Sequence, residues 1–309
     1  MSTAPAEVEY LIVGAGPGGL QLAQQLAARN RSYLVLEAGE SVGTFFRSMP
    51  RHRMLLSINK VHSGIDEDWQ HLRWDWNSLI SDDPHLRFTR WSSDYFPHAD
   101  QYRAYLVAFA ERHRLAVKLG TKVTRLRRSD RFVATDAEGM TYRARTVVMA
   151  TGSAQPYVPP IRGIELADTY AGMSTDARAF TDRRVLVIGK GNAGFETASH
   201  LLATAATIHM VSPRPVRLAW NTHYPGDVRV ANNPFLDSHH LKVRTAIFNA
   251  TVESITRRAD GALTVGLCHT DAIDDREELV YDDVLACTGF QMESAIFDRT
   301  AMPALRAFA

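Results

Sequence analysis

Two stretches of this sequence decide its fold: Val8–Gly19, which reads VEYLIVGAGPGG, and Val185–Gly194, which reads VLVIGKGNAG. Each is an apolar run that ends in the spacing Gly-x-Gly-x-x-Gly and continues into a stretch of helix-forming residues. This spacing is typical of the strand–turn–helix that binds the pyrophosphate of a dinucleotide. Because one dinucleotide needs one such site, the two copies predict two redox cofactors, most simply a nicotinamide that gives its hydride to a flavin.

The first fingerprint favours a cofactor whose ribose carries no extra phosphate. Gly14 permits a tight turn, Gly16 lets the backbone approach a pyrophosphate, and Gly19 lets the helix pack closely on the strand. Glu37 directly follows the next strand pattern, Tyr33–Leu36. A carboxylate there accepts hydrogen bonds from ribose hydroxyls and repels a 2′-phosphate. This site therefore suits FAD or NAD rather than NADP.

The second fingerprint is followed by hydroxyl and basic residues instead of an acidic one. After the strand pattern Ile208–Val211 the chain reads Ser212-Pro213-Arg214-Pro215-Val216-Arg217. Ser212 and Arg214 can hold a 2′-phosphate, because a guanidinium pairs with phosphate through charge-assisted hydrogen bonds. We therefore expect NADPH rather than NADH. The alternative is that Arg214 is a surface charge in a proline-rich loop.

The order of elements repeats along the chain, which indicates an internal duplication. Each fingerprint is followed by a helix, a strand and a β-meander, and the copies close on Ala150-Thr151-Gly152 and Cys287-Thr288-Gly289. The sequence therefore predicts an α/β fold of two Rossmann-like dinucleotide-binding domains, each with three layers of the ββα type. We expect an FAD domain at 1–155 and 281–309, with an NADP domain at 156–280 inserted into it.

The first copy contains a long insertion between Glu37 and a helix pattern that begins near Asp100. The insertion is rich in Trp, His and Arg and shows little periodicity. Long irregular insertions in compact domains are usually functional or disordered. Since the aromatic content favours packing, we interpret this segment as a cover over the flavin end. An exposed, tryptophan-rich cover could also pair with a second subunit in a homodimer.

Composition argues against several classes of function. The net charge is +1 without a long run of one sign, which does not indicate a nucleic-acid partner. No apolar run reaches the ~18 residues of a membrane span, and residues 1–9 lack the basic start and apolar core of a secretory signal. Cys268 and Cys287 form no Cys-x-x-Cys pair, and the histidines show no helix-spaced metal pair. We expect a cytoplasmic protein without a membrane, nucleic-acid or metal partner.

Several stretches besides the glycine motifs resemble a known family: Pro50–Arg53, Leu56–Lys60, Asp75–Leu79, Thr222–Tyr224, Gly226–Asp227, Asn232–Asn233 and Leu236–Asp237. With the two fingerprints, they resemble the class B flavin monooxygenases. They resemble more closely the FAD-dependent oxidoreductase domain-containing proteins, whose animal member is an endoplasmic-reticulum flavoprotein linked to protein degradation. The likeness covers nearly the whole chain and implies FAD and NADPH as cofactors.

Two departures from the family pattern bear on activity. The family's linker motif, Phe-x-Gly-x-x-x-His-x-x-x-(Trp/Tyr/Phe), is similar to Tyr170–Phe180, with Asp176 in place of the histidine. The substitution implies a position off the main monooxygenase branch. The family's last segment, which returns to the FAD domain beside the flavin, has no counterpart in Phe290–Ala309. We therefore expect a truncated form, or a flavin site completed by other residues or by another chain.

The motifs and the resemblance together predict the cofactor site. The resemblance implies that Gly43 and Phe46 lie near the flavin and that the backbone of Val123 meets the adenine. It also implies a catalytic role for Asn59 beside the isoalloxazine ring, although Asn59 could instead be a loop-capping asparagine. The predicted cofactor-binding residues are Gly14, Gly16, Pro17, Gly18, Gly19, Glu37, Ala38, Gly43, Phe46, Arg47, Val123, Ala150, Thr151, Gly152, Gly189, Gly191, Asn192, Ala193, Gly194, Ser212, Arg214 and Gly289.

The same resemblance implies that His223, Tyr224 and Asp227 face the substrate or the nicotinamide. The alternative is that they form an ordinary structural turn. Pocket shape would come from the insertion Arg47–Phe96 and the loop Leu218–His240, whose sequences show no regular pattern. The substrate is therefore not defined by the sequence.

Three functions are compatible with these patterns. The first is an NADPH-dependent FAD monooxygenase, which oxygenates a small-molecule or carrier-bound substrate at nitrogen, sulfur or a ketone through a flavin C4a-hydroperoxide. The second is an NADPH:acceptor flavin oxidoreductase or oxidase that inserts no oxygen. The third is a non-catalytic flavin-binding partner protein. The completeness of the motifs favours the monooxygenase.

Overall fold

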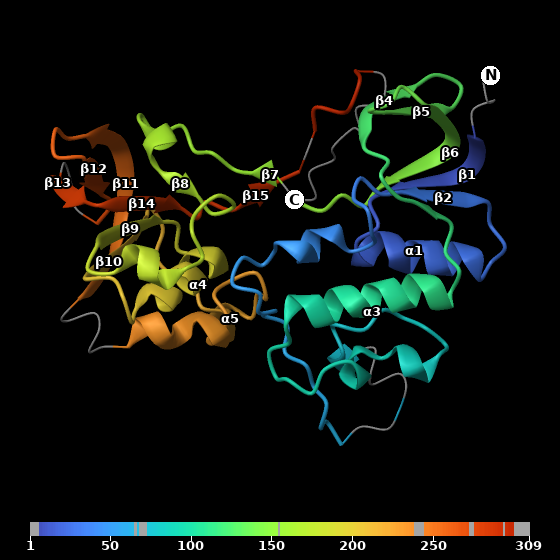
Figure 1. Ribbon diagram of the computed structural model, residues 1–309, viewed down its shortest axis with the longest axis horizontal. Helices are drawn as coiled ribbons and strands as arrows, with labels where there is room; N and C mark the ends of the chain where they lie inside the picture. Colours follow the sequence, from blue (N-terminus) through green and yellow to red (C-terminus); the bar gives the residue numbers. More distant parts are fainter. Residues whose placement is uncertain are drawn as a thin grey trace. The chain divides into compact units, whose positions relative to one another are not determined.

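The computed structural model describes residues 6–64, 67, 73–153, 155–237, 244–271, 275–292 and 294–299. These residues divide into two compact units, Met1–Ala154 with Met292–Ala309, and Gln155–Gln291. Figure 1 shows one large sheet in each unit, mainly blue and green in the first and yellow to red in the second. Each unit contains one of the two fingerprints.

The first unit is built on a six-stranded sheet with the order β3-β2-β1-β6-β5-β4. In this sheet β1 is parallel to β2 and β6, β2 is parallel to β3, and β4, β5 and β6 form an antiparallel meander. The strands are β1 (Ala6–Val13), β2 (Tyr33–Leu36), β3 (Val117–Lys118), β4 (Val123–Arg128), β5 (Phe132–Asp136) and β6 (Thr141–Met149).

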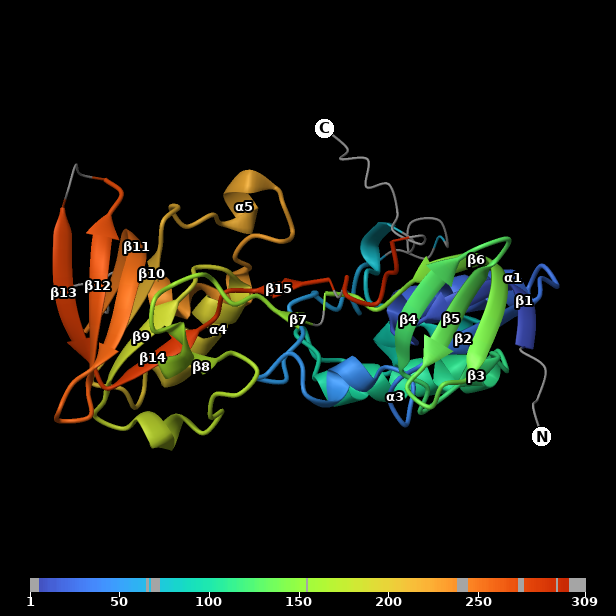
Figure 2. The ribbon, with the colours of Figure 1, turned by 90° about the horizontal axis from the view of Figure 1, so that it is seen from above.

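The first unit has three layers. Helices α1 (Pro17–Ala27) and α3 (Ala99–Arg112) cover one face of the sheet, and the meander covers the other (Figures 1 and 2). The alternation of β1 explains this arrangement, because successive side chains of a strand point to opposite faces. Ile12 belongs to the helical core, whereas Leu11 and Val13 belong to the core beneath the meander.

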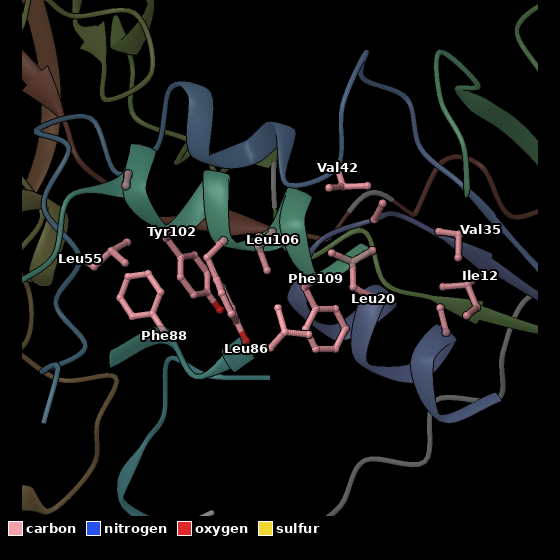
Figure 3. Close-up of a cluster of buried hydrophobic side chains, with 14 of the residues drawn as sticks. Ile12, Leu20, Val35, Val42, Leu55, Leu86, Phe88, Tyr102, Leu106 and Phe109 are labelled. Carbon is pink, nitrogen blue, oxygen red and sulfur yellow. The ribbon is translucent and has the colours of Figure 1, made fainter. Parts of the chain in front are cut away.

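The aromatic insertion is partly built into the helical core. Figure 3 shows Phe88 beside Tyr102 of α3 and Leu86 beside Phe109, and the rings of Phe88 and Tyr102 lie 5.2 Å apart, edge to face. The hydroxyl of Tyr105 accepts a 2.6 Å hydrogen bond from the backbone N–H of Leu79. The insertion contains the short helices η1 (Thr44–Arg47), η2 (Pro84–Leu86) and η3 (Phe88–Arg90).

The second unit is built on a seven-stranded sheet with the order β13-β12-β11-β10-β9-β14-β8. Strands β11, β10, β9, β14 and β8 are parallel, and the second half of β11 forms an antiparallel meander with β12 and β13. The strands are β8 (Asp168–Thr169), β9 (Arg184–Ile188), β10 (Thr207–Ser212), β11 (Thr245–Arg257), β12 (Leu263–His269), β13 (Arg276–Tyr281) and β14 (Asp283–Ala286), and a separate pair joins β7 (Gln155–Pro156) to β15 (Phe290–Gln291).

The second unit repeats the layers of the first. Helix α4 (Asn192–Leu201) follows the fingerprint, and the meander packs on Leu186 and Ile188 of β9 through residues such as Tyr281. The other helices described in this unit are short: η4 (Ile164–Leu166), η5 (Ala177–Phe180), α5 (Ala219–Thr222) and η6 (Val230–Leu236). No helix in the described part of the chain has the length and apolar character needed to cross a membrane.

The two units have the same strand register around their fingerprints. Val13 of β1 pairs with Leu36 of β2, and Ile188 of β9 pairs with Val211 of β10. The N–H of Gly14 donates to the carbonyl of Leu36 and that of Gly189 to the carbonyl of Val211, both at 2.8 Å. The predicted α/β fold with two Rossmann-like domains is confirmed by this topology.

The segment after residue 280 differs from the sequence-based expectation. We expected 281–309 to belong to the first domain, but β14 pairs with β9 and so lies in the second sheet. Farther along, the N–H of Leu126 donates to Ile296 and the N–H of Asp298 donates to Leu126, at 2.7 and 2.8 Å. The chain therefore re-enters the first unit only after β15.

Candidate functional site

The first fingerprint contains two glycines that the packing of the protein itself requires. Gly14 has a φ of +106°, and a Cβ atom on it would lie 2.5 Å from the carbonyl oxygen of Ala150. A Cβ atom on Gly19 would lie 2.0 Å from the carbonyl oxygen of Gly14. Side chains at these positions would push helix α1 away from β1 and β6.

The other two glycines of this fingerprint have no such structural reason. A Cβ atom on Gly16 or Gly18 would meet nothing within 4 Å. The helix begins at Pro17, and no side chain caps its first N–H groups. An open space in front of unsatisfied N–H groups at a helix N-terminus suits an anionic group such as a pyrophosphate. The geometry therefore fits the dinucleotide proposed from the sequence.

Glu37 is held against the fingerprint by backbone hydrogen bonds. Its Oε2 accepts a 2.7 Å bond from the N–H of Ala15, and its Oε1 accepts a 2.9 Å bond from the N–H of Gly39. The carbonyl of Ala15 in turn accepts a 3.0 Å bond from the N–H of Gly43. Because each carboxylate oxygen has two lone pairs, Glu37 can still accept bonds from ribose hydroxyls. Ala38 lies between Glu37 and Gly39.

Gly43, Phe46 and Arg47 form the turn and short helix after Glu37. Gly43 has a φ of +66°, and a Cβ atom on it would lie 2.9 Å from Leu106 Cδ1 of α3. The ring of Phe46 packs edge to face on Tyr102 at 4.9 Å. Arg47 is exposed and lies 3.9 Å from the carboxylate of Glu40. Gly43 and Phe46 thus have packing roles, whereas the guanidinium of Arg47 is exposed and its only recorded contact among the described residues is this long ion pair.

The remaining predicted residues of the first unit lie at the ends of strands. Val123 is buried at the start of β4 in the core beneath the meander. The N–H of Ala150 donates a 2.8 Å bond to Val13, which places this residue beside the fingerprint. Thr151 and Gly152, which has a φ of +64°, are exposed and follow directly.

Asn59 is a buried amide that is only half satisfied. It is 4% exposed, its N–H donates to the carbonyl of Tyr95 at 2.9 Å, and its Nδ2 donates to the carbonyl of Ser92 at 2.6 Å. Its Oδ1 is buried without a hydrogen-bond partner among the described residues. Leaving a buried acceptor unpaired costs about 1–3 kcal/mol. Asn59 therefore joins two loops, as the capping alternative requires, and leaves one buried acceptor unused.

The second fingerprint repeats the division between packing glycines and an open one. Gly189 has a φ of +121°, and its Cβ atom would lie 2.2 Å from the carbonyl oxygen of Cys287. A Cβ atom on Gly194 would lie 2.3 Å from the carbonyl oxygen of Gly189. At Gly191 a Cβ atom would meet nothing within 4 Å, and no side chain caps the start of α4. This geometry too suits a dinucleotide.

The side chain of Asn192 is occupied within the protein. Its Nδ2 donates to the carbonyl of Asp227 at 2.9 Å, and its Oδ1 accepts from the N–H of Arg229 at 2.9 Å and from Asn232 Nδ2 at 3.1 Å. These bonds fasten the loop 224–232 to the first turn of α4. A cofactor contact is therefore left to the backbone of Asn192 and of Ala193, its neighbour in that turn.

Two of the predicted substrate residues, Tyr224 and Asp227, lie in this loop, and His223 directly precedes it. Oδ2 of Asp227 accepts a 2.7 Å bond from Thr222 Oγ1 and lies 3.1 Å from Nε of Arg217, contacts that favour a structural role. His223 ends α5 in a left-handed conformation with a φ of +57°. Tyr224 has 58% of its surface exposed and is the residue of the three that is best placed to meet a ligand.

Ser212 and Arg214 lie at the carboxyl end of β10. Because Val211 corresponds to Leu36 in register, Ser212 occupies the position that Glu37 has in the first unit. Ser212 Oγ donates to the carbonyl of Arg214 at 3.3 Å, and Arg214 is exposed. Gly289, with a φ of +87°, accepts a bond from the N–H of Tyr157.

A buried Tyr–Glu pair lies in the second unit, and the sequence did not predict it. The hydroxyl of Tyr170 donates a 2.9 Å hydrogen bond to Oε2 of Glu196, and Oε1 of Glu196 has no partner among the described residues. Burial raises the pKa of Glu196 to about 7. The sequence does contain one sign of this pair: Glu196 lies between Phe195 and Ala198, on the face of α4 that is buried.

The two cysteines are not a redox pair in this fold. Cys287 is buried after β14, and its Sγ donates to Thr197 Oγ1 at 3.7 Å. Burial raises the pKa of this thiol to about 12, which disfavours the reactive thiolate. Cys268 is half-buried on β12, and both thiols are free.

Comparison with known proteins agrees with the fold and the two fingerprints. The chain is 38% identical over 341 residues to FAD-dependent oxidoreductase domain-containing protein 2 of Danio rerio, covering 96% of this chain and 50% of that protein. It is 27% identical to the probable indole-3-pyruvate monooxygenase YUCCA1 of Arabidopsis thaliana, over 65% of this chain and 46% of that protein. It spans about half the length of the curated relatives it matches.

Among solved structures, the chain is similar to a flavin-containing monooxygenase from Stenotrophomonas maltophilia. The TM-score is 0.72 at 21% identity, covering 95% of this chain and 82% of that one. This likeness shows the shared fold. The family model described as "Pyridine nucleotide-disulphide oxidoreductase" matches residues 11–305. The chain belongs to the pyridine nucleotide-disulphide oxidoreductase family.

Proposed function

We propose that this protein is an NADPH-dependent FAD monooxygenase that oxygenates a small-molecule or carrier-bound substrate. The observation that carries the proposal is the open space beside Gly16 and the open space beside Gly191, which we call the two cradles. Both glycines precede an uncapped helix, and neither is needed for packing. Two such cradles in one chain suit two dinucleotides.

The residue beside each cradle supports the proposed choice of cofactor. In the first unit the Glu37 carboxylate would accept bonds from the adenosine ribose of FAD and repel a 2′-phosphate. In the second unit Ser212 occupies the same position, and Arg214 adds a guanidinium, which suits NADPH. When bound, the two cofactors supply hydride transfer to the flavin and its reaction with oxygen.

The chain itself would position and shield the cofactors. A shift of the Asn59 loop on FAD binding would let its buried, unused Oδ1 accept a hydrogen bond from a donor of the flavin ring. Packing of the insertion on α3 holds the Asn59 loop in place. The name of the YUCCA1 relative supports a monooxygenase, and that of the Danio rerio relative supports an FAD-dependent oxidoreductase.

A second candidate is an oxidoreductase or oxidase that uses the same cofactors without oxygen insertion. Asp176, at the position of the family's linker histidine, is exposed and begins η5. Its Oδ1 accepts a 3.0 Å bond from the N–H of Arg178, and its carboxylate pairs with that guanidinium. These contacts are those of a helix cap, which favours a reaction that does not need the histidine.

The test is to load purified protein with FAD, reduce it with NADPH under nitrogen, and then admit oxygen together with a panel of amines, thioethers and ketones. A monooxygenase gives oxygenated product with little peroxide. Peroxide equal to the NADPH consumed, without product, supports the second candidate. Flavin binding without any reduction by NADPH leaves a partner-binding flavoprotein and rejects both enzymes.

A further inference from the structure

Lys190, the residue between Gly189 and Gly191, has an unusual environment for a lysine. It is 8% exposed, and its Nζ donates to the carbonyl of Phe248 at 2.9 Å and to Asn249 Oδ1 at 2.5 Å. An ammonium group has three N–H donors. Among the described residues the structure records no acceptor for the third donor and no carboxylate in direct contact with Nζ. The charge is therefore buried without a direct counter-ion.

The duplication of the fold allows Lys190 to be compared with the equivalent residue of the first unit. In the first unit Ala15 is the equivalent residue, and its N–H meets the carboxylate of Glu37. In the second unit Lys190 replaces Ala15, and Ser212 replaces Glu37. The carboxyl end of the parallel strands thus carries a negative charge beside the fingerprint in the first copy and a positive charge in the second.

Lys190 also lies close to Ser212. Its ammonium contacts Asn249, which pairs with Ser212 across the neighbouring strands β10 and β11. Both residues lie at the carboxyl end of the parallel strands, where the adenosine half of a dinucleotide binds in this fold. Asn249 is itself oriented by a 3.0 Å bond from its Nδ2 to Asp271 Oδ2.

A purely structural role does not explain why a charged residue is buried at position 190. Burial of an ammonium is costly unless an anion balances it, and desolvation lowers the pKa of Lys190. Two hydrogen bonds to strand β11 could be made by a neutral side chain without this cost. The Asp271 carboxylate acts on this charge only from beyond Asn249, to which it is bonded. A dianionic ligand beside Nζ would supply a direct counter-ion and occupy the third donor.

We propose that Lys190 is a specificity-determining residue that, with Ser212, binds the phosphomonoester on the 2′ position of the adenosine ribose. The proposal rests on the proposed use of NADPH in the second unit. It adds a residue from inside the fingerprint to the phosphate site. The part of NADPH that it recognises is the adenosine 2′-phosphate rather than the pyrophosphate or the nicotinamide.

The test uses calorimetric titration of the full chain with 2′,5′-ADP, with 5′-AMP and with inorganic phosphate. The variants are Lys190→Met, Lys190→Arg as the conservative change, and Arg257→Met as a control that removes one exposed positive charge from the same unit. We expect Lys190→Met to weaken 2′,5′-ADP binding at least about tenfold. Binding of 5′-AMP should change less than about twofold, and Lys190→Arg and Arg257→Met should retain the preference for 2′,5′-ADP.

Three results would overturn the role of Lys190 alone. The first two are an equal loss for both nucleotides, as a purely structural role would give, and an unchanged preference for 2′,5′-ADP. Inorganic phosphate that binds as tightly as 2′,5′-ADP would show a site for free phosphate and also overturn it. A wild-type protein that binds 5′-AMP and 2′,5′-ADP equally would reject the NADPH assignment itself. The two failures are therefore distinguishable.

Discussion

The Tyr170 hydroxyl donates a 2.9 Å hydrogen bond to Glu196, and this tyrosine is the solvent-shielded partner of a carboxyl group whose other oxygen is unpaired. Glu196 is 7% exposed, and burial raises its pKa from 4.5 to about 7. A carboxyl group with a higher pKa in the folded protein stabilises the fold when protonated. Its contribution is therefore fully present below the unfolded-chain pKa and is lost as the pH rises to about 7.

The first prediction is that Glu196→Gln flattens this pH dependence. The amide remains neutral and can still accept the bond from Tyr170. Relative to the variant, the wild type should lose about 2–3 kcal/mol of unfolding free energy between pH 5 and pH 8. Urea unfolding of the cofactor-free proteins at both pH values measures this difference. Parallel pH profiles for the two proteins would show that Glu196 does not change its protonation on unfolding in this range.

The second prediction separates glycines that the fold needs from glycines that the cofactor needs. Gly19→Ala places a Cβ atom 2.0 Å from the carbonyl oxygen of Gly14, so it should destabilise the first unit by about 3 kcal/mol or more. Gly16→Ala meets no atom within 4 Å and keeps an allowed φ of −77°. It should change stability by less than about 1 kcal/mol, yet weaken FAD binding at least about tenfold.

The same contrast should hold for Gly194→Ala and Gly191→Ala in the second unit, with NADPH as the ligand. Chemical unfolding without ligand and fluorescence titration with each cofactor measure the two effects. If Gly16→Ala and Gly191→Ala bind their cofactors as the wild type does, the open cradles do not hold pyrophosphates.

The fold was predictable from the sequence because its signals are local. Each fingerprint, strand and helix is specified by residues close together in the chain, and the position of Glu37 follows from counting along one strand. The boundary near β14 was missed because the strand's place in the second sheet depends on its pairing with β9, about one hundred residues away in the sequence.

Parts of the site could not be predicted for the same reason. The bonding of the Asn192 side chain to Asp227, Arg229 and Asn232 depends on a loop whose sequence shows no periodicity, so the motif predicted only the place of Asn192 at the start of α4. Likewise, no pattern joins Tyr170 in the linker to Glu196 in the helix. In both cases the chemistry is visible in the sequence, but the contact is set by tertiary packing.

The third prediction concerns the loop that Asn192 fastens. Asn192→Leu keeps the volume of the side chain but leaves the N–H of Arg229 without its acceptor and the carbonyl of Asp227 without its donor. The Asn232 amide keeps the backbone carbonyl of residue 192 as an acceptor. Each unpaired buried group costs about 1–3 kcal/mol, so the loop 224–232 should open more often. Hydrogen exchange should be faster at Arg229 and its neighbours, whereas Asn221→Ala, on the exposed face of α5, should leave exchange unchanged. Unchanged protection in Asn192→Leu would mean that other contacts hold the loop.

The fourth prediction uses two buried asparagines of the insertion to isolate the role of Asn59. Asn59 Nδ2 donates to Ser92, and Asn77 Nδ2 donates to Ser57, so each side chain bonds one backbone carbonyl. Both are 4% exposed, but the buried unpaired oxygen belongs to Asn59.

Asn59→Ala and Asn77→Ala should therefore lose similar stability, about 1–3 kcal/mol each, because each leaves a carbonyl unpaired. They should differ with the cofactor bound: Asn59→Ala should weaken FAD binding about tenfold or shift the flavin absorption spectrum, since it removes the free acceptor. Asn77→Ala should do neither. Fluorescence titration and spectra of the reconstituted variants measure these effects. If both variants behave alike toward FAD, the Oδ1 of Asn59 does not contact the flavin, and Asn59 only stabilises its loop.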